Sequence, residues 1–238
     1  MMFKDQVVVI TGGAHGIGAC IKAMFEKEGA RVYSIDLVKH DGFQGDIGKQ
    51  EDLEAFVQTI LASETQVNHI INNAKPAMLG LDEASYEDFN AALRVGITAP
   101  FWLVKCLKDH LAPHASIVNI ASSRDRMSQP QTESYAAAKG GIDSLTHAMA
   151  MSLAGKARVN AISPGWIDVD GSLYTGSDAT QHPVKRVGKP EDIAHMVLFL
   201  CSKKAGFMTG ENICIDGGMT RQMIYHGDDG WNLEEIKE

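Results

Sequence analysis

The sequence has few cysteines and no long apolar run. Its four cysteines lie far apart, with neither a CxxC pair nor a Cys/His spacing typical of zinc ligands, so we expect reduced thiols and no metal site. No apolar run approaches the roughly 18 residues of a membrane-spanning helix, and the first six residues are too short and polar for a signal peptide. These absences predict a cytoplasmic protein without a membrane partner.

Positive charge is also scarce and is not concentrated anywhere. Lys and Arg number 22 against 30 Asp and Glu, which gives a formal net charge of −8, and the basic residues are scattered along the chain. A nucleic-acid backbone requires a concentrated positive face, so nucleic acid is excluded as the main partner, whereas a small anionic molecule is not. The nine histidines form no HExxH or similar pair, and no residue is assigned to a metal.

What the chain does have is a regular alternation of apolar segments and helical patterns. The apolar segments span 7–11, 31–36, 69–73, 116–121, 158–163 and 212–216, with a further short one at 43–46. They are rich in β-branched residues and bounded by turn residues, as expected for buried parallel strands. Between them apolar residues recur at helical spacing, for example at Leu53, Phe56, Val57 and Ile60. This predicts the α/β class: one Rossmann-type domain over 1–238, with a doubly wound parallel sheet of about seven strands and helices on both faces.

Two segments do not follow this alternation. Residues 168–187 are rich in Gly, Ser, Thr and Asp and have no clean period, so we expect a substrate loop over the crevice at the carboxyl ends of the strands. Residues 219–238 form a polar C-terminal tail with apolar anchors such as Met223 and Trp231. We expect this tail on the surface or in a subunit contact.

A glycine-rich turn follows the first expected strand and leads directly into a helix. It reads Thr11-Gly12-Gly13-Ala14-His15-Gly16-Ile17-Gly18. Glycines allow a tight turn and a close approach of the backbone to a diphosphate, and the helix N-terminus supplies free N–H groups and a partial positive charge. The turn therefore predicts a dinucleotide site; a tight turn without a ligand is the alternative.

An acidic residue at the end of the second strand indicates which dinucleotide. Asp36 lies eighteen residues after Gly18, near the spacing at which a carboxylate meets the adenosine ribose. A carboxylate there accepts hydrogen bonds from the 2′- and 3′-hydroxyls and repels a 2′-phosphate. No Arg adjoins the glycines, and His15 stands where an NADP-dependent enzyme would often place a cation. We therefore expect NAD rather than NADP, the alternative being that Asp36 only caps a turn.

Further along, a set of motifs resembles the short-chain dehydrogenase/reductase family. Besides the glycine turn, these motifs are Asn72-Asn73-Ala74, Ser122 followed thirteen residues later by Tyr135-Ala-Ala-Ala-Lys139, the segment Arg158-Val159-Asn160-Ala161-Ile162-Ser163-Pro164-Gly165, and Gly210-Glu211-Asn212 followed by Asp216-Gly217-Gly218. A YxxxK match alone carries little weight, because it arises easily by chance. The motifs gain weight because they follow the family's order and cover nearly the whole chain, from Val7 to about Gly218.

The spacing of the tyrosine and the lysine has a chemical reason. Residues i and i+4 share one helix face, so we expect the Lys139 ammonium near the Tyr135 phenol. A free tyrosine has a pKa of about 10, and a nearby positive charge together with oxidised nicotinamide favours the phenolate. The resemblance implies that Tyr135 exchanges the hydroxyl proton, that Lys139 lowers its pKa and holds the nicotinamide ribose, and that Ser122 bonds the reacting oxygen. A merely structural Tyr–Lys pair is the alternative.

The resemblance also implies further contacts to the cofactor. Asp46 and Ile47 would border the adenine, and Asn73 and Ala74 would line the adenosine side. Pro164, Gly165 and Ile167 would place backbone against the nicotinamide carboxamide. The complete expected cofactor site consists of Gly12, His15, Gly16, Ile17, Gly18, Asp36, Asp46, Ile47, Asn73, Ala74, Tyr135, Lys139, Pro164, Gly165 and Ile167.

Three positions depart from the family's pattern. Lys75 stands after Asn-Ala where glycine is usual, and Val169 takes a threonine position. Gly96 replaces a catalytic asparagine of the next helix, which would help to bind the water that connects Lys139 to solvent. Two functions therefore remain open. One is NAD(H)-dependent hydride transfer between nicotinamide and a secondary alcohol or ketone, and the other is a catalytically weakened member that binds NAD(H) as a sensor or partner module.

The substrate and the assembly are indicated only in outline. The charged residues Arg124, Asp125 and Arg126 lie in a loop that shapes the substrate pocket in the family, and with Lys75 the arginines would receive a carboxylate or phosphate. A solvated loop is the alternative. We expect a small alcohol or carbonyl substrate that is anionic or polyhydroxylated. The resemblance implies a homotetramer or homodimer formed through the helices that begin near Tyr86 and Tyr135.

Overall fold

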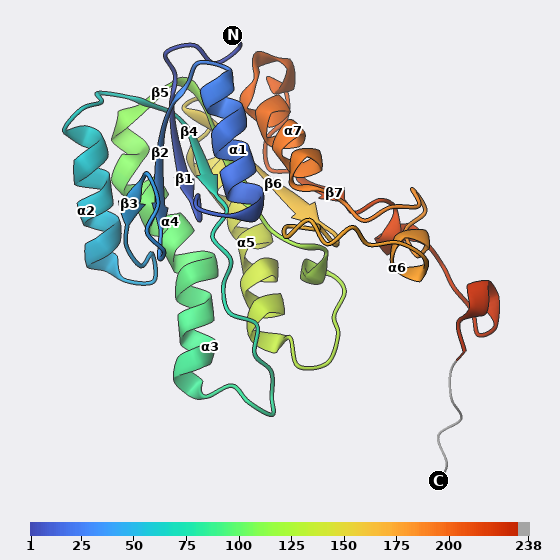
Figure 1. Ribbon diagram of the computed structural model, residues 1–238. Helices are drawn as coiled ribbons and strands as arrows, with labels where there is room; N and C mark the ends of the chain where they lie inside the picture. Colours follow the sequence, from blue (N-terminus) through green and yellow to red (C-terminus); the bar gives the residue numbers. More distant parts are fainter. Residues whose placement is uncertain (233–238) are drawn as a thin grey trace.

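Seven parallel strands lie side by side in the computed structural model, which describes residues 1–232 (Figure 1). Their order across the sheet is β3-β2-β1-β4-β5-β6-β7. The strands are β1 (Val7–Thr11), β2 (Arg31–Asp36), β3 (Phe43–Gln44), β4 (Val67–Asn72), β5 (Leu111–Ile120), β6 (Ala157–Pro164) and β7 (Asn212–Ile215). The expected doubly wound sheet is confirmed. The order of the strands reverses between β1 and β4, and in sheets of this kind the reversal opens a crevice at the carboxyl ends.

Helices cover both faces of the sheet. On one face lie α1 (Gly16–Lys27) and α7 (Pro190–Cys201), and on the other α2 (Gln50–Leu61), α4 (Ala99–Leu107) and the inner side of α5 (Glu133–Ser152). The helix α3 (Tyr86–Leu93) packs on α5 and continues through a π-helical turn, Arg94–Thr98, into α4. No helix within residues 1–232 is long and apolar enough to cross a membrane.

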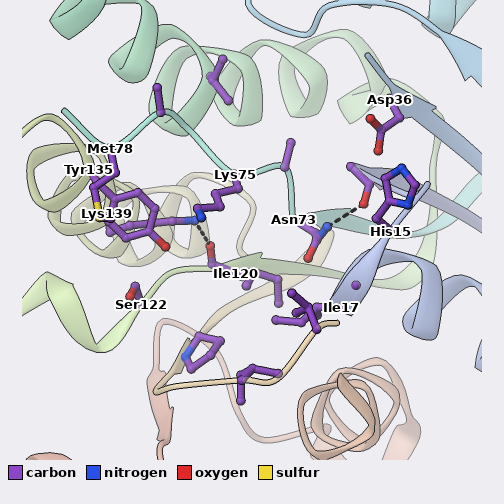
Figure 2. A pocket seen from close by; sticks show the side chains of 18 of the residues that line it. His15, Ile17, Asp36, Asn73, Lys75, Met78, Ile120, Ser122, Tyr135 and Lys139 are labelled. Atoms are coloured by element: carbon purple, nitrogen blue, oxygen red, sulfur yellow. Dashed lines mark hydrogen bonds between the residues drawn. The ribbon is translucent and has the colours of Figure 1, made fainter. Parts of the chain in front are cut away.

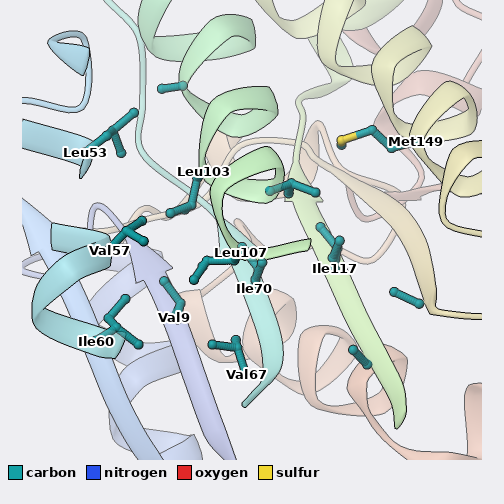
Figure 3. Packing of buried hydrophobic residues seen from close by; sticks show 14 of the residues in the cluster. Val9, Leu53, Val57, Ile60, Val67, Ile70, Leu103, Leu107, Ile117 and Met149 are labelled. Atoms are coloured by element: carbon teal, nitrogen blue, oxygen red, sulfur yellow. The ribbon is translucent and has the colours of Figure 1, made fainter. Parts of the chain in front are cut away.

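The strand β1 shows why a continuous apolar run is required at the centre of the sheet. Val7 and Val9 pack against the face covered by α2 and α4, where Figure 3 shows Val9 among the leucines and isoleucines of these helices. Val8 and Ile10 point to the opposite face and pack with α1 and α7. Because successive side chains alternate across a strand, a strand covered on both faces has to be apolar at every position.

The segments outside the alternation are more ordered than their composition indicates. The expected substrate loop, 168–187, contains the short helix α6 (Ser177–Thr180), and Oδ1 of Asp168 accepts backbone hydrogen bonds from residues 170, 171 and 172.

The described part of the C-terminal tail leaves the body of the molecule and exposes Met223, Tyr225 and Trp231 (Figure 1). Residues 233–238 of the expected tail lie outside the described residues, and a subunit contact through the tail stays a prediction.

Candidate active site

A cavity of about 960 Å³ lies at the carboxyl ends of the central strands. Four residues of the glycine turn (Gly12, His15, Gly16 and Ile17) and Asp36 line one end, while Ser122, Tyr135 and Lys139 line the other (Figure 2). The structure brings nearly all the residues expected from the sequence to this cavity: Gly12, His15, Gly16, Ile17, Asp36, Asp46, Ile47, Asn73, Ala74, Ser122, Tyr135, Lys139, Pro164, Gly165 and Ile167 all line it. Gly18 does not, because it lies beneath the turn.

The glycine turn is shaped to leave its backbone accessible. A Cβ on Gly18 would lie 1.9 Å from the carbonyl oxygen of Gly12, so no larger residue fits at this position. The helix α1 begins after His15, whose side chain makes no capping hydrogen bond, and its first turn contains no acidic residue. The N–H groups at the start of α1 therefore remain available to an anion from the cavity, an arrangement that fits a diphosphate.

Side chains hold this turn from the neighbouring strands. Asn73 Nδ2 donates to the carbonyl oxygens of Thr11 and Gly12, at 3.1 and 2.8 Å. Thr11 Oγ1 accepts from the backbone N–H groups of Asn73 and Ala74, at 3.0 and 3.1 Å. The Asn-Ala segment thus fixes the turn as well as lining the cavity. The sequence named Thr11 only as part of a motif and did not reveal this contribution.

Asp36 is held where β2 meets the glycine turn. Its Oδ2 accepts the N–H of Ala14 at 3.0 Å, and its Oδ1 accepts the N–H of Val38 at 3.3 Å. The carboxylate therefore has a fixed position at the cavity rim. A carboxylate oxygen has more than one lone pair, so both oxygens keep capacity to accept further donors from the cavity.

At the other end of the cavity, β5 and α5 bring the expected catalytic residues together. Ser122 precedes the 3₁₀ turn Ser123–Asp125, and its Oγ accepts the N–H of Arg124 at 3.2 Å. Tyr135 and Lys139 lie in the first turns of α5, and Lys139 Nζ is 5.6 Å from the centre of the Tyr135 ring. The spacing of one helical turn therefore places the Lys139 ammonium near the Tyr135 ring, as expected from the sequence. Lys139 is almost completely buried, and its Nζ donates to the carbonyl oxygen of Ile120 at 2.6 Å.

The electrostatics of this end differ from the expectation. Burial raises the pKa of the Tyr135 phenol above its usual value, and a hydrogen bond with Ser122 and the charge of Arg124 only partly oppose it. Burial, with the nearby charge of Lys75, lowers the pKa of Lys139 to about 7. The sequence-based expectation of a lowered pKa for Tyr135 included the charge of oxidised nicotinamide; among the chain's own residues, desolvation outweighs the neighbouring charges and raises this pKa.

The three departures from the family's pattern also lie at or beside the cavity. Lys75 lines it, and its side chain extends toward the Lys139 ammonium (Figure 2). Val169 lines it near Gly16. Gly96 is buried in the π-helical turn rather than in a regular helix, and a Cβ there would lie 2.6 Å from the Cβ of Ala138.

Asp125 has a structural role beside this site that the sequence did not reveal, since the sequence indicated it only as one charge of the loop after Ser122. Its side chain is only 3% exposed, although it lies in a loop that reads as solvated. It accepts hydrogen bonds from Ser163 Oγ and Asn212 Nδ2, both at 2.7 Å, and from Arg126 Nε at 2.8 Å. Burial acts to raise the pKa of Asp125, but these hydrogen bonds hold it below its usual value. Asp125 thus fastens the turn after Ser122 to β6 and β7.

Comparisons with known proteins agree with this geometry. The family model described as enoyl-(acyl carrier protein) reductase matches residues 12–220. An uncharacterized oxidoreductase of Thermotoga maritima is 35% identical and is aligned over 94% of this chain and 99% of its own. The 2-(S)-hydroxypropyl-CoM dehydrogenase 3 of Xanthobacter autotrophicus is 34% identical, over 91% and 97% of the two chains.

A solved structure is similar over almost the whole length. The SCOR enzyme from Clostridium thermocellum superposes with a TM-score of 0.91 at 40% identity and covers 97% of this chain and 99% of its own. The fold, the length of the chain and the order of the motifs all indicate the same family. The chain therefore belongs to the short-chain dehydrogenase/reductase family of oxidoreductases, whose members use NAD or NADP and act on small molecules.

Proposed function

We propose that the protein is an NAD(H)-dependent oxidoreductase that transfers a hydride between nicotinamide and the carbon of a secondary alcohol or ketone, with Tyr135 as the acid/base. One observation carries this proposal. Ser122, Tyr135 and Lys139 meet at one end of a cavity whose other end is an open helix N-terminus beside a fixed carboxylate. A dinucleotide would extend from one of these ends to the other, and hydride transfer at a carbon that bears a hydroxyl requires an acid/base beside that carbon.

The residues that would hold the cofactor follow from the same cavity. The N–H groups of α1 would bind the diphosphate, and Asp36 would accept hydrogen bonds from the ribose hydroxyls and disfavour a 2′-phosphate. Asp46, Ile47, Asn73 and Ala74 would line the adenosine, and Pro164, Gly165 and Ile167 would place backbone beside the nicotinamide. When bound, the cofactor supplies or accepts the hydride.

The proton is handled by the chain itself. A neutral Tyr135 phenol is a donor to the oxygen of a ketone, and its raised pKa favours this protonated form at neutral pH. Ser122 acts to lower the pKa of the same phenol and would bond the reacting oxygen. In the oxidation direction the phenol has to lose its proton first, and the positive charges of Lys139 and Arg124 favour that step.

A catalytically weakened NAD(H)-binding sensor is the second candidate. It is favoured by Gly96, which places no side chain where the family has a catalytic asparagine. The intact Ser122, Tyr135 and Lys139 favour the enzyme. Turnover decides between the two functions, because both require the cofactor to bind.

The test is NADH oxidation with a panel of ketones, and NAD reduction with the matching alcohols, for the wild type and Tyr135→Phe. We expect turnover with NAD(H), and a loss of about 10²–10⁴-fold in kcat on removal of the phenolic hydroxyl. NADH fluorescence should report unchanged cofactor binding in the variant. Tight NADH binding without turnover on any compound would support the sensor instead.

We further propose that this activity belongs to a cytoplasmic homotetramer or homodimer. The helices α3 and α5 pack together, and Tyr86 at the start of α3 is 87% exposed in the single chain. An exposed aromatic ring of this kind is typical of a subunit interface. Light scattering of the purified protein gives the assembly directly, and a monomer would contradict the proposal.

A further inference from the structure

Three cationic side chains from three separate elements meet around the expected acid/base. Lys75 follows β4, Arg124 lies in the turn after β5, and Lys139 lies on α5; all three line the cavity. The acidic residues that line the cavity are Asp36 and Asp46, which belong to the opposite end, and Asp170, which is exposed on the 168–187 loop. Positive charge therefore dominates where the substrate would lie.

Neither Lys75 nor Arg124 has a carboxylate partner within residues 1–232. Four other arginines do form ion pairs with acidic side chains: Arg31, Arg94, Arg126 and Arg186. Among residues 1–232, the guanidinium of Arg124 donates a hydrogen bond only to the side-chain amide oxygen of Gln129, a neutral group. This contrast indicates that the cavity holds two uncompensated cations rather than ordinary surface ion pairs.

The charges act on the groups that would carry out the chemistry. Figure 2 shows Lys75 extending toward Lys139, and after burial its charge is the second cause of the lowered pKa of Lys139. The charge of Arg124 reaches the Tyr135 phenol. Like charges placed together without a counter-ion are unfavourable, and an anion bound among them would remove that cost.

Arg124 is also held in place before any ligand arrives. Its backbone N–H donates to Ser122 Oγ, and Asp125 fastens the same turn to β6 and β7 through its buried carboxylate. A preorganised arginine loses less conformational entropy on binding and presents a planar pair of donors to a carboxylate or phosphate.

We infer that the substrate carries an anionic group, a carboxylate or a phosphate, which binds between Lys75 and Arg124 beside the reacting carbon. The inference rests on the proposed function for the nature of that carbon. The sequence left open whether the substrate is anionic or polyhydroxylated, and the two unpaired cations favour an anionic one. Hydroxyl-rich neutral compounds would accept hydrogen bonds from the two cations but would not neutralise their charge.

The experiment compares matched substrates that differ only in charge. Acetoacetate is paired with methyl acetoacetate, and glucose 6-phosphate with glucose, for the wild type, Lys75→Gln and Arg124→Gln. We expect the wild type to prefer one anionic member in kcat/KM by about tenfold or more, and each variant to lose most of that preference, because one hydrogen-bonded charge is worth about a factor of ten. Whether acetoacetate or the phosphate is preferred identifies the anionic group. Lys203→Gln makes the same charge change at an exposed lysine that does not line the cavity and should keep the preference.

A binding measurement separates this inference from the proposed function. Malonate is titrated into the NADH complex and followed by NADH fluorescence, with the same variants. Malonate binding that weakens in both variants supports the anion site even if no compound turns over. The absence of turnover would count against the proposed function alone.

Three results would overturn the anion site and leave the proposed function standing. The first is equal turnover of both members of each pair in all variants, and the second is a wild-type preference for neutral glucose. The third is weaker NADH binding in Lys75→Gln with an unchanged substrate preference, since Lys75 would then serve the cofactor diphosphate.

Discussion

The Cβ atom that Gly96 lacks would lie 2.6 Å from the Cβ of Ala138. Ala138 immediately precedes Lys139 on α5, and Gly96 lies in the π-helical turn between α3 and α4. At this point the two backbones approach so closely that no side chain fits, and π-helical turns are frequent at functional sites. The family's asparagine is therefore replaced in a region whose packing now requires glycine.

We expect Gly96→Ala to destabilise the protein by about 1–3 kcal/mol, because the added methyl group overpacks against α5. The helix propensity of alanine opposes this by about 1 kcal/mol. Ala138→Gly in the same chain should recover part of the loss, since it removes the opposing Cβ but itself costs about 1 kcal/mol in helix propensity within α5. Urea unfolding of the four chains of this double-mutant cycle measures the coupling. Additive effects, or a more stable single Gly96→Ala variant, would show that the contact is not limiting.

The sequence predicted the central strands because their residues are apolar for a local reason. Every residue of β1 is buried, so its run and its turn boundaries could be identified without tertiary information. The start of β5 at Leu111 was missed: the prediction began at residue 116, because Pro113 and His114 interrupt the strand signal. His114 has a positive φ of 63°. Such a residue is uncommon within a strand and gives no apolar pattern to detect.

The site was predictable in its members but not in its electrostatics. Motif order placed Ser122, Tyr135 and Lys139 together, because a helix face and the carboxyl edge of a sheet are fixed by local geometry. The raised pKa of Tyr135 and the burial of Asp125 depend on how far each group is removed from water. That distance is set by packing between segments remote in sequence, so no spacing of residues could give it.

In the proposed function, the nucleotide preference would depend on the fixed carboxylate of Asp36. Replacing it in Asp36→Ser removes the acceptor for the ribose hydroxyls and the repulsion of a 2′-phosphate. We expect kcat/KM for NAD to fall about tenfold and the ratio of NADP to NAD activity to rise by more than that, since one charge-assisted hydrogen bond is worth about 1.5 kcal/mol or more. Steady-state kinetics with both cofactors measure the ratio. The exposed Asp109→Ser provides the same chemical change outside the cavity, and an unchanged ratio in Asp36→Ser would contradict the assignment.

The pKa of Lys139 should control the alkaline side of the pH profile. Burial and the charge of Lys75 lower this pKa to about 7, so the ammonium is lost as the pH rises through neutrality. Lys75→Met removes one of the two causes and raises the pKa of Lys139. With a neutral ketone as substrate, the alkaline limb of kcat/KM should then move to higher pH by about half a unit or more.

Arg124 provides the matched comparison for that experiment. It acts on Tyr135, the other titrating group beside Lys139, and its charge opposes the raised pKa of the phenol. Arg124→Gln should therefore raise the pKa of the phenol further and move to higher pH any limb of the kcat/KM profile that reports on Tyr135. Lys203→Gln should move neither limb. A profile that shifts in Arg124→Gln but not in Lys75→Met would assign the alkaline limb to Tyr135 instead of Lys139.

Asp125 should matter for catalysis without touching the reacting atoms. Asp125→Ala leaves Ser163 and Asn212 without their shared acceptor and loosens the turn that follows Ser122. Because a displacement of about 1 Å at a catalytic group costs on the order of 10²-fold, we expect kcat to fall 10- to 100-fold. NADH binding, measured by fluorescence, should stay near that of the wild type, and Asp125→Asn should recover part of kcat by restoring an acceptor. An equal loss of NADH binding would indicate general unfolding of the site instead.

His69 should make the protein sensitive to acid at a position remote from the cavity. Its ring lies against Phe3 and Phe25 at the amino ends of the strands, with Nε2 2.7 Å from Gln6 Oε1, and burial lowers its pKa to about 3. The folded protein therefore keeps the ring neutral, whereas the unfolded chain binds a proton below about pH 6.5. The contribution of His69 to the free energy of unfolding is therefore fully present above about pH 6.5. It is lost as the pH falls toward 3, with a slope of at most about 1.4 kcal/mol per pH unit.

His69→Gln removes the titrating group and keeps a donor for Gln6. We expect the variant to be less stable than the wild type at pH 7, because it loses the ring contacts, but to lose stability more slowly between pH 6 and pH 4. Urea unfolding at each pH measures the difference in slope. The control is His114→Asn at an exposed position, which should leave the slope unchanged. Asparagine is chosen because it tolerates the positive φ of His114. Parallel slopes for His69→Gln and the wild type would mean that another buried group dominates the acid response.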